Sequence, residues 1–181
     1  RSIPITTLFL DIGGVLLTDG WGYQSRALAA QTFDLNLEEL QERHHLTFDT
    51  YEVGKLTLKE YLNQTVFYEA RSFTQAQFRE FMFAQSQPYP EMIELVSQLK
   101  VWYGLKSAVV SNEARELNAH RIQKFKLAEF IDFFISSCFV RFRKPDVDIF
   151  RLALDIAQTP AEPAARTPHT AKVVTTGEVL G

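Results

Sequence analysis

The sequence predicts an α/β fold: a three-layer α/β/α core with a parallel sheet, and an inserted block of helices. Apolar, strand-like runs over 8–10, 105–110 and 133–136 alternate with segments whose apolar residues recur at helical spacing. The stretch from about residue 20 to residue 86 carries helical signals only. Strands that alternate with helices are typical of a parallel sheet, and the helical stretch would then interrupt the connection between the first two strands.

Composition limits the class of protein. The chain has 181 residues and a net charge of −3, with no basic stripe, which argues against nucleic acid as a main partner. Its one cysteine, Cys138, excludes an internal disulfide framework. Apolar runs stay well below the length of about 18 residues that a membrane span needs, and the first residues lack the apolar stretch of a secretory signal. We therefore expect a soluble, cytoplasmic protein without a membrane partner.

The first strand-like run ends on a carboxylate, Asp11, and a glycine pair, Gly13 and Gly14, follows. Open α/β sheets bind ligands at the carboxyl ends of their strands. The glycines let the backbone approach a ligand closely because they have no Cβ. A carboxylate in this place can be a nucleophile or a metal ligand. On this segment alone, an aspartate that only caps the next element is an equal alternative.

The inserted block shows clear helix starts. Thr57 and Glu60 form a capping box, and Thr74 with Gln77 repeats the pattern. Gly54 is typical of a helix stop. The expected helices cover 23–33, 37–46 and 57–68, with a fourth after Thr74. A Pro-Tyr-Pro hinge at 88–90 ends the block, so we predict a helical cap over 19–87 and a core made of 1–18 plus 88–181.

The second half returns to alternating elements. Helices are expected over 92–103, 113–125 and 146–158, around the strands 105–110 and 133–136. The segment 159–170 is rich in Pro, Ala and Thr, which is typical of a loop. A short strand is possible over 172–176.

Polar residues follow each predicted core strand. Asp11 follows the first, Ser111 and Asn112 follow the second, and Lys144 lies beyond the third. Because a parallel sheet gathers its carboxyl ends along one edge, these side chains are expected to meet there. A hydroxyl, an amide and an ammonium around a carboxylate suit a phosphoryl group.

Three motifs carry a resemblance to a known family. They are Asp11-Ile-Gly-Gly-Val15, Val109-Val-Ser-Asn112 and Arg143-Lys-Pro-Asp146. In this order, with a helical insertion after the first, they resemble the motifs of the haloacid dehalogenase-like (HAD) hydrolase superfamily over roughly residues 5–160. The resemblance implies a Rossmann-like core and a small α-helical cap.

The resemblance also implies roles for single residues. Asp11 would attack a phosphoryl group and form an aspartyl-phosphate, and Lys144 would offset the negative charge. Asp11 and the backbone carbonyl of Gly13 would hold Mg²⁺. The cap would close over the site and select the leaving group. The resemblance also implies that phosphate is bound by three residues, Ser111, Asn112 and Gly14.

The sequence departs from the family at two places. Gly13 stands where most family phosphatases carry a second aspartate, the general acid/base, whose chemistry is worth about 10²–10⁴-fold. Asp19 is a possible replacement, and the alternative is a turn residue before Gly20. The family's fourth motif, a strand ending in acids that complete the Mg²⁺ shell, is not found: Glu162 follows no strand and Glu178 comes too late. Mg²⁺ binding is expected to be weak without it.

Two other features of the sequence favour structural roles. Adjacent His44 and His45 point to different faces of a helix, which favours solvated or capping roles over a metal site. Trp21 favours packing in the cap over lining a substrate pocket.

The leading hypothesis is a Mg²⁺-dependent phosphatase that acts on a small phosphorylated metabolite. One alternative is a catalytically weak HAD-like domain that binds a ligand or a protein partner, which both departures favour. The other is a metal-free 2-haloacid dehalogenase, although such relatives usually carry an aromatic residue where Gly13 stands. The sequence names neither the substrate nor the oligomeric state.

Overall fold

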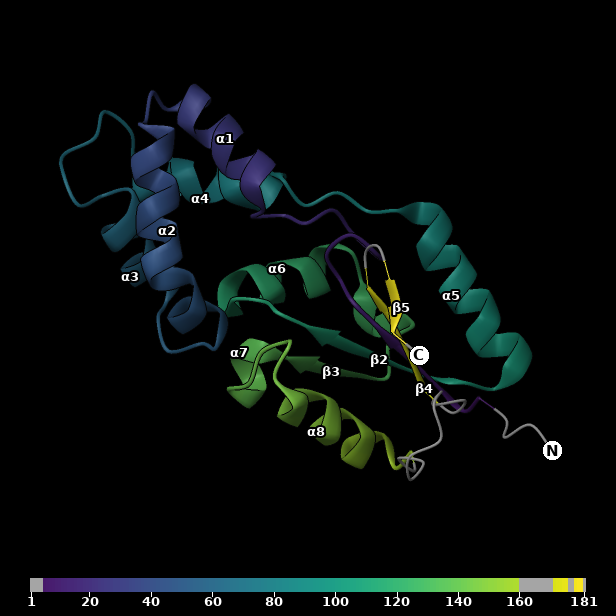
Figure 1. Cartoon of the computed structure of the whole chain (residues 1–181). Coiled ribbons are helices and arrows are strands. Elements are labelled where there is room, and N and C mark those ends of the chain that lie inside the picture. The colour runs from purple at the N-terminus through teal and green to yellow at the C-terminus, as the bar shows by residue number, and fades with distance from the viewer. Residues whose placement is uncertain (1–4, 160–170, 176–177, 181) are drawn as a thin grey trace.

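The computed structural model describes residues 5–159, 171–175 and 178–180. Within these ranges the strands form one sheet in the order β3-β2-β1-β4-β5 (Figure 1). Neighbours run parallel from β3 to β4, and β5 is antiparallel to β4. The strand bounds are β1 Thr7–Leu10, β2 Lys106–Ser111, β3 Phe133–Ser136, β4 Ala171–Thr175 and β5 Glu178–Leu180.

Helices cover both faces of this sheet, as predicted for the α/β class. One face packs against α5 through Val96, and the other packs against α8 through Ile149 and Ala153. Along β1, Leu10 contributes to the first cluster and Phe9 to the second, as the alternation of a strand requires. The core helices are α5 Pro90–Tyr103, α6 Arg115–Lys124, the short α7 Ser137–Val140 and α8 Val147–Ala157, with a 3₁₀ turn at Leu127–Glu129.

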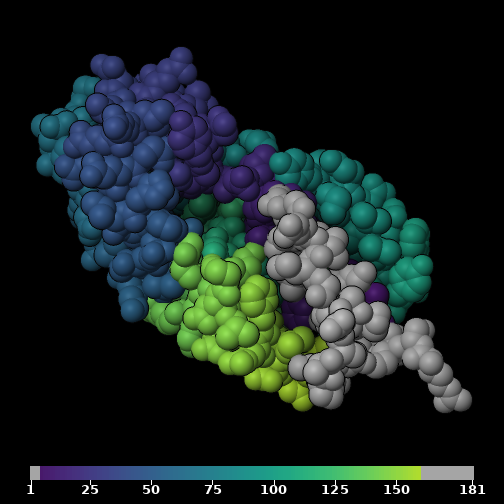
Figure 2. Space-filling model, viewed as in Figure 1, coloured from purple at the N-terminus to yellow at the C-terminus, as the bar shows by residue number. Residues whose placement is uncertain are grey.

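Four helices between β1 and α5 form a separate layer, seen at one end of the molecule in Figure 1. They are α1 Tyr23–Thr32, α2 Leu37–Glu52, α3 Leu58–Thr65 and α4 Gln75–Ala84. Their buried aromatic cluster includes Tyr61 and Phe78 and extends to Leu117 of α6. The surface is hollowed between this layer and the core (Figure 2). The division into a cap at 19–87 and a core stays a prediction.

Helix starts follow the sequence more closely than helix ends. Both predicted capping boxes form, at Thr57 with Glu60 and at Thr74 with Gln77. The second cap helix runs six residues past its predicted end at Leu46 and stops at Glu52, because the chain has no helix breaker before Gly54. Gly54 has φ +71°, and a Cβ there would lie 2.7 Å from the Cys138 carbonyl oxygen, so this glycine permits close contact between α2 and α7.

The C-terminal part contains the short strand that the sequence allows over 172–176. It is β4, Ala171–Thr175, and it pairs with β1 in the register Leu10 to Val174. Glu178 begins β5 and its backbone lies opposite Thr175. Glu162 lies outside the described residues. Of the helices that the structure describes, none has the length and apolar character needed to cross a membrane.

Candidate active site

Asp11, Ser111 and Lys144 meet at the carboxyl edge of the sheet, as their positions after the strands predict. The Ser111 hydroxyl donates to Asp11 Oδ1 at 2.8 Å, and the Lys144 ammonium makes an ion pair with Asp11 Oδ2. The backbone N–H of Ile12 also donates to Asp11 Oδ1, at 2.8 Å. Both carboxylate oxygens are therefore held in fixed directions by three donors from separate parts of the chain.

Asn112 holds the loop that carries Lys144. Its Nδ2 donates to the Lys144 carbonyl at 3.0 Å, and its Oδ1 accepts from the Lys144 N–H at 2.7 Å. The amide thus uses both of its ends on the backbone of one residue. In this structure Asn112 positions Lys144, and direct contact between Asn112 and a phosphate stays a prediction.

The glycine pair shapes the loop after Asp11. Gly14 has φ +74°, a conformation that favours glycine, and its N–H donates to the Leu17 carbonyl at 2.7 Å. This contact occupies the Gly14 N–H inside the loop, and a phosphate contact there stays a prediction. Gly13 faces the cavity, where a Cβ would lie 3.4 Å from Asp19 Oδ1.

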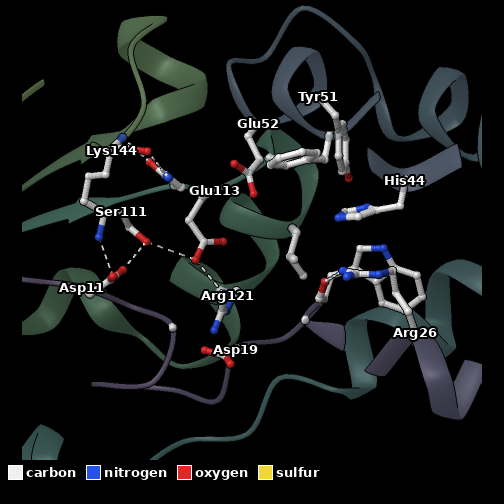
Figure 3. A pocket seen from close by; sticks show the side chains of 17 residues that line it. Asp11, Asp19, Arg26, His44, Tyr51, Glu52, Ser111, Glu113, Arg121 and Lys144 are labelled. Atoms are coloured by element: carbon white, nitrogen blue, oxygen red, sulfur yellow. Dashed lines mark hydrogen bonds and ion pairs between the residues drawn. The ribbon is translucent and has the colours of Figure 1, made fainter. Parts of the chain in front are cut away.

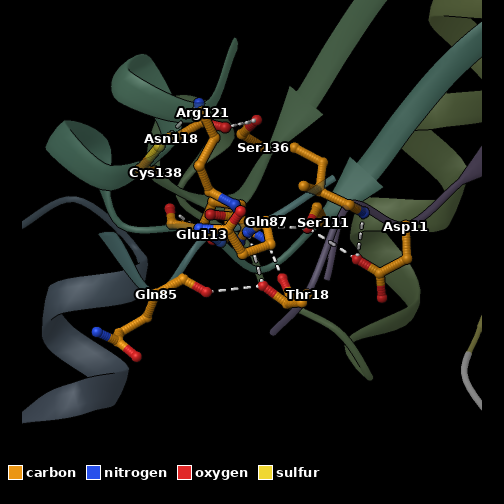
Figure 4. A network of polar contacts seen from close by, with 12 residues as sticks. Asp11, Thr18, Gln85, Gln87, Ser111, Glu113, Asn118, Arg121, Ser136 and Cys138 are labelled. Atoms are coloured by element: carbon orange, nitrogen blue, oxygen red, sulfur yellow. Dashed lines mark hydrogen bonds and ion pairs between the residues drawn. The ribbon is translucent and has the colours of Figure 1, made fainter. Parts of the chain in front are cut away.

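A second, buried ion pair lies directly behind Ser111. Arg121 donates to Glu113 Oε1 at 2.6 Å, and their side chains are only 1% and 3% exposed (Figure 4). Burial raises the pKa of Glu113, and the charge of Arg121 opposes that rise. Arg121 also donates to the Thr18 carbonyl, and the Ser111 hydroxyl lies 3.3 Å from Glu113 Oε1. The pair therefore ties α6 to the loop after β1 and to the Ser111 side chain.

The cavity above Asp11 has a volume of about 350 Å³ and lies between the sheet edge and the cap helices (Figure 3). Its core side includes Asp11, Ser111 and Lys144. Its cap side combines aromatic faces with charged and polar groups, contributed by Trp21, Arg26, His44, Phe48, Tyr51 and Glu52.

A chain of hydrogen bonds fixes His44 in the cap wall. Trp21 Nε1 donates to the Tyr61 hydroxyl at 2.9 Å, and that hydroxyl lies 2.7 Å from His44 Nδ1. Burial, helped by the charge of Arg26, lowers the pKa of His44 to about 3, so the ring is neutral at pH 7. The tryptophan N–H donates to the tyrosine hydroxyl, which is also in hydrogen-bond contact with Nδ1. His44 is thus a neutral ring held in a fixed position.

Two charged side chains share the same wall. Arg26 is 7% exposed and donates to the Trp21 carbonyl at 2.6 Å and to Gln41 Oε1 at 2.8 Å. Glu52 Oε2 accepts from Arg143 at 2.7 Å, and burial raises the pKa of Glu52. The cap wall therefore presents both a cation and a carboxylate to the cavity.

The family model of haloacid dehalogenase-like hydrolases matches residues 5–165. The chain belongs to this family. No curated protein matches this chain in sequence.

Solved structures of HAD-like proteins share the fold at low sequence identity. A predicted HAD-like family hydrolase from Porphyromonas gingivalis has a TM-score of 0.69 at 16% identity, covering 94% of this chain and 82% of its own. A HAD family enzyme from Bacteroides thetaiotaomicron, in complex with magnesium and inorganic phosphate, has a TM-score of 0.67 at 16% identity over 85% and 79%. The L-2-haloacid dehalogenase from Xanthobacter autotrophicus, with chloropropionic acid covalently bound, has a TM-score of 0.57 at 16% identity over 85% and 65%.

Several residues that form or line this site are not identified as site residues by the sequence patterns. Glu113 and Arg121 carried a weak signal only, an acid two residues after Ser111 and an arginine eight residues further along the same helical segment. Nothing local marks Arg26 or Glu52, which reach the cavity because the cap folds over the sheet. His44 was expected to be solvated or capping, but it is partly buried and lines the cavity.

The donors for a divalent cation are limited in the described ranges, which contain no cluster of three or more His, Cys, Asp or Glu side chains. Asp11 supplies one carboxylate at the cavity and Gly13 supplies a backbone carbonyl on the same loop. Mg²⁺ commonly binds through one or two carboxylates together with substrate phosphate and water. This donor set fits Mg²⁺ only in that minimal form, with the phosphate providing part of the shell.

Proposed function

We propose that this HAD-like hydrolase is a phosphatase of a small phosphorylated metabolite and that it works through an aspartyl-phosphate on Asp11. The observation that carries the proposal is the geometry of Asp11: a carboxylate at the base of a cavity of about 350 Å³, held by Ser111 and Lys144. A nucleophile with a fixed direction and an adjacent cation is what phosphoryl transfer requires.

Asp11, Lys144 and Ser111 have separate roles in the proposed reaction. An Asp11 oxygen attacks phosphorus, the bond from phosphorus to the leaving oxygen breaks, and water then releases phosphate from Asp11. The Lys144 ammonium beside Asp11 offsets the charge that the phosphoryl oxygens bring, in a cavity where water is partly excluded. Ser111 orients the nucleophile through Oδ1.

Mg²⁺ enters this proposal in a limited role. Asp11 and the Gly13 carbonyl would hold the ion, which would neutralise phosphoryl charge when bound. Magnesium and phosphate in the Bacteroides thetaiotaomicron enzyme support the choice of ion and ligand.

The cap wall favours a polar leaving group. Arg26 presents hydrogen-bond donors, Glu52 presents an acceptor, His44 presents a neutral imidazole, and Phe48 and Tyr51 present ring faces. A small hydroxylated metabolite matches such a lining better than an apolar one, because buried polar groups without partners are costly.

A second candidate is hydrolysis of a 2-haloacid. The ion pair of Asp11 with Lys144 would equally serve displacement of a halide, and the structurally similar Xanthobacter autotrophicus enzyme carries chloropropionic acid covalently bound. A domain that binds a phosphorylated ligand without turnover is the third candidate.

The test compares wild type with Asp11→Asn on a panel of sugar and hydroxy-acid phosphates, with Mg²⁺ and with EDTA. We expect wild type to release phosphate and the variant to lose at least 10³-fold in kcat/KM, because an amide is a poor nucleophile. Asp155→Asn, which changes an exposed carboxylate on α8, is the matched control and should keep full activity.

The same protein samples separate the other candidates. Release of halide from a 2-haloacid in EDTA, without phosphate release from the panel, would establish the dehalogenase instead. Tight binding of a phosphorylated compound with no turnover would support the binding domain. Full activity of Asp11→Asn would disprove the nucleophile.

A further inference from the structure

The carboxylate of Asp19 lies on the nucleophile's own loop, between two glycines. A Cβ on Gly13 would lie 3.4 Å from Asp19 Oδ1, and a Cβ on Gly22 would lie 3.6 Å from Asp19 Oδ2. Both distances are ordinary van der Waals contacts, so the carboxylate lies against the backbone of both glycines. Gly13 is two residues after Asp11, and Asp11 and Asp19 both line the cavity (Figure 3).

Asp19 differs from the other carboxylates of the cavity in its contacts. It is exposed and lines the cavity, and it has no hydrogen-bond or ion-pair partner among the side chains described, those of residues 5–159. Glu113 is buried against Arg121, and Glu52 is held by Arg143. Among these three, Asp19 is the carboxyl group whose proton can reach a substrate without breaking a contact that the structure shows.

The remaining titratable groups of the cavity are poor proton donors. The pKa of His44 is lowered to about 3 by burial, and its Nδ1 is already in contact with Tyr61. The Tyr51 hydroxyl is buried without a partner in the described part of the chain, and burial raises its pKa well above the usual range. Lys144 is paired with Asp11. An alcohol leaving group needs a proton as it departs, and Asp19 is the acid that remains.

We infer that Asp19 is the general acid and base of the proposed phosphatase reaction. When Asp11 attacks, the electron pair of the breaking bond moves to the leaving oxygen, which takes the Asp19 proton and departs as an alcohol. The Asp19 carboxylate then accepts a proton from water, whose oxygen attacks phosphorus and displaces Asp11. Phosphate leaves and Asp19 is protonated again, so the cycle closes without another reactant. This inference rests on the function proposed above.

The test uses two substrates that differ in their need for a proton. Phenyl phosphate leaves as a weakly acidic phenol and needs one, whereas 2,4-dinitrophenyl phosphate leaves as a stable phenolate. We expect Asp19→Asn to lower kcat/KM for phenyl phosphate about 10²–10³-fold, within the usual range of acid catalysis, and for the dinitrophenyl ester less than tenfold. Activity that persists on the activated ester also shows that the variant is folded.

Matched variants keep the outcomes distinct. Asp155→Asn should change neither substrate, and Asp11→Asn should abolish both. Equal losses of both substrates in Asp19→Asn would overturn the role of Asp19 and leave the phosphatase proposal standing, as would an altered Mg²⁺ requirement with no dependence on leaving group. Failure of wild type to release phosphate from either ester would overturn both proposals.

Discussion

Two pairs of opposite charges lie on either side of Ser111, and their surroundings differ. Lys144 and Asp11 face the cavity, with side chains 14% and 18% exposed, whereas Arg121 and Glu113 are 1% and 3% exposed. The Ser111 hydroxyl touches both carboxylates, at 2.8 Å and 3.3 Å. Similar chemistry thus serves two purposes: one pair can meet a substrate, and the other fixes the groups around it.

Removing Lys144, the cation of the pair that faces the cavity, should affect activity most. Lys144→Met is expected to lower kcat/KM for phosphate release about 10²–10³-fold, the usual cost of losing one electrostatic contact in a transition state. The free energy of unfolding should change by about 1 kcal/mol or less, because Asp11 can be hydrated from the cavity. Kinetics and urea unfolding of the same sample measure both effects.

Lys59→Met, which changes an exposed lysine on α3, is the control for Lys144→Met. If Lys144→Met instead lowered the free energy of unfolding by several kcal/mol and hardly changed kcat/KM, the pair of Lys144 with Asp11 would be structural, contrary to this prediction.

Removing the cation of the buried pair should affect stability most. Arg121→Met is expected to lower the free energy of unfolding by about 3–5 kcal/mol, because it leaves the Glu113 carboxyl buried without its partner. The double variant with Glu113→Gln should be less destabilised than Arg121→Met alone, since it removes both charges. Urea unfolding measures the difference, and equal stabilities of the single and double variants would contradict it.

The smallest expected effect is the pH dependence of stability that His44 of the cap wall causes. The pKa of His44 lies at about 3 in the folded protein against an ordinary value of 6.5. The unfolded chain therefore binds this proton first, and stability is lost as pH falls below about 6.5. Between pH 7 and pH 5 this histidine should cost about 1–2 kcal/mol.

In His44→Gln, the fall in melting temperature between pH 7 and pH 5 should be shallower than in wild type. His45→Gln, on the exposed neighbour, is the control and should change the slope much less, because the charge of His45 is the smallest of the three causes that lower the pKa of His44. A slope that stays the same in His44→Gln would mean that the ring is not held neutral by burial.

Much of the fold could be predicted because its signals are local. The strand at Phe133–Ser136 and the capping boxes at Thr57 and Thr74 agree with the sequence, since apolar alternation and cap chemistry act over a few residues. The end of α2 was predicted too early, because apolar spacing fades before the helix does. The short helix α7 has no periodic pattern of its own and was not predicted.

The residues of the candidate site also separate into those with local sequence signals and those that depend on packing. Asp11, Ser111 and Lys144 were found because each follows a strand, and parallel strands bring such positions to one edge. Arg26, His44 and Glu52 were not assigned to the cavity, because their approach depends on how the cap packs over the sheet. Arg121 and Glu113 lie eight residues apart in the chain, and only the folded structure shows that they form a buried ion pair.

The sequence by itself determined the class of the core, the chain order of β1 to β3 and of the helices α1 to α6 and α8, and the three polar groups at the sheet edge. Tertiary structure decided that Asn112 holds Lys144, that a buried pair supports Ser111, and that the Asp19 carboxylate lies against Gly13 and Gly22. The physical reason is range: periodicity and capping act between near neighbours, whereas burial and ion pairing depend on residues that only folding brings together.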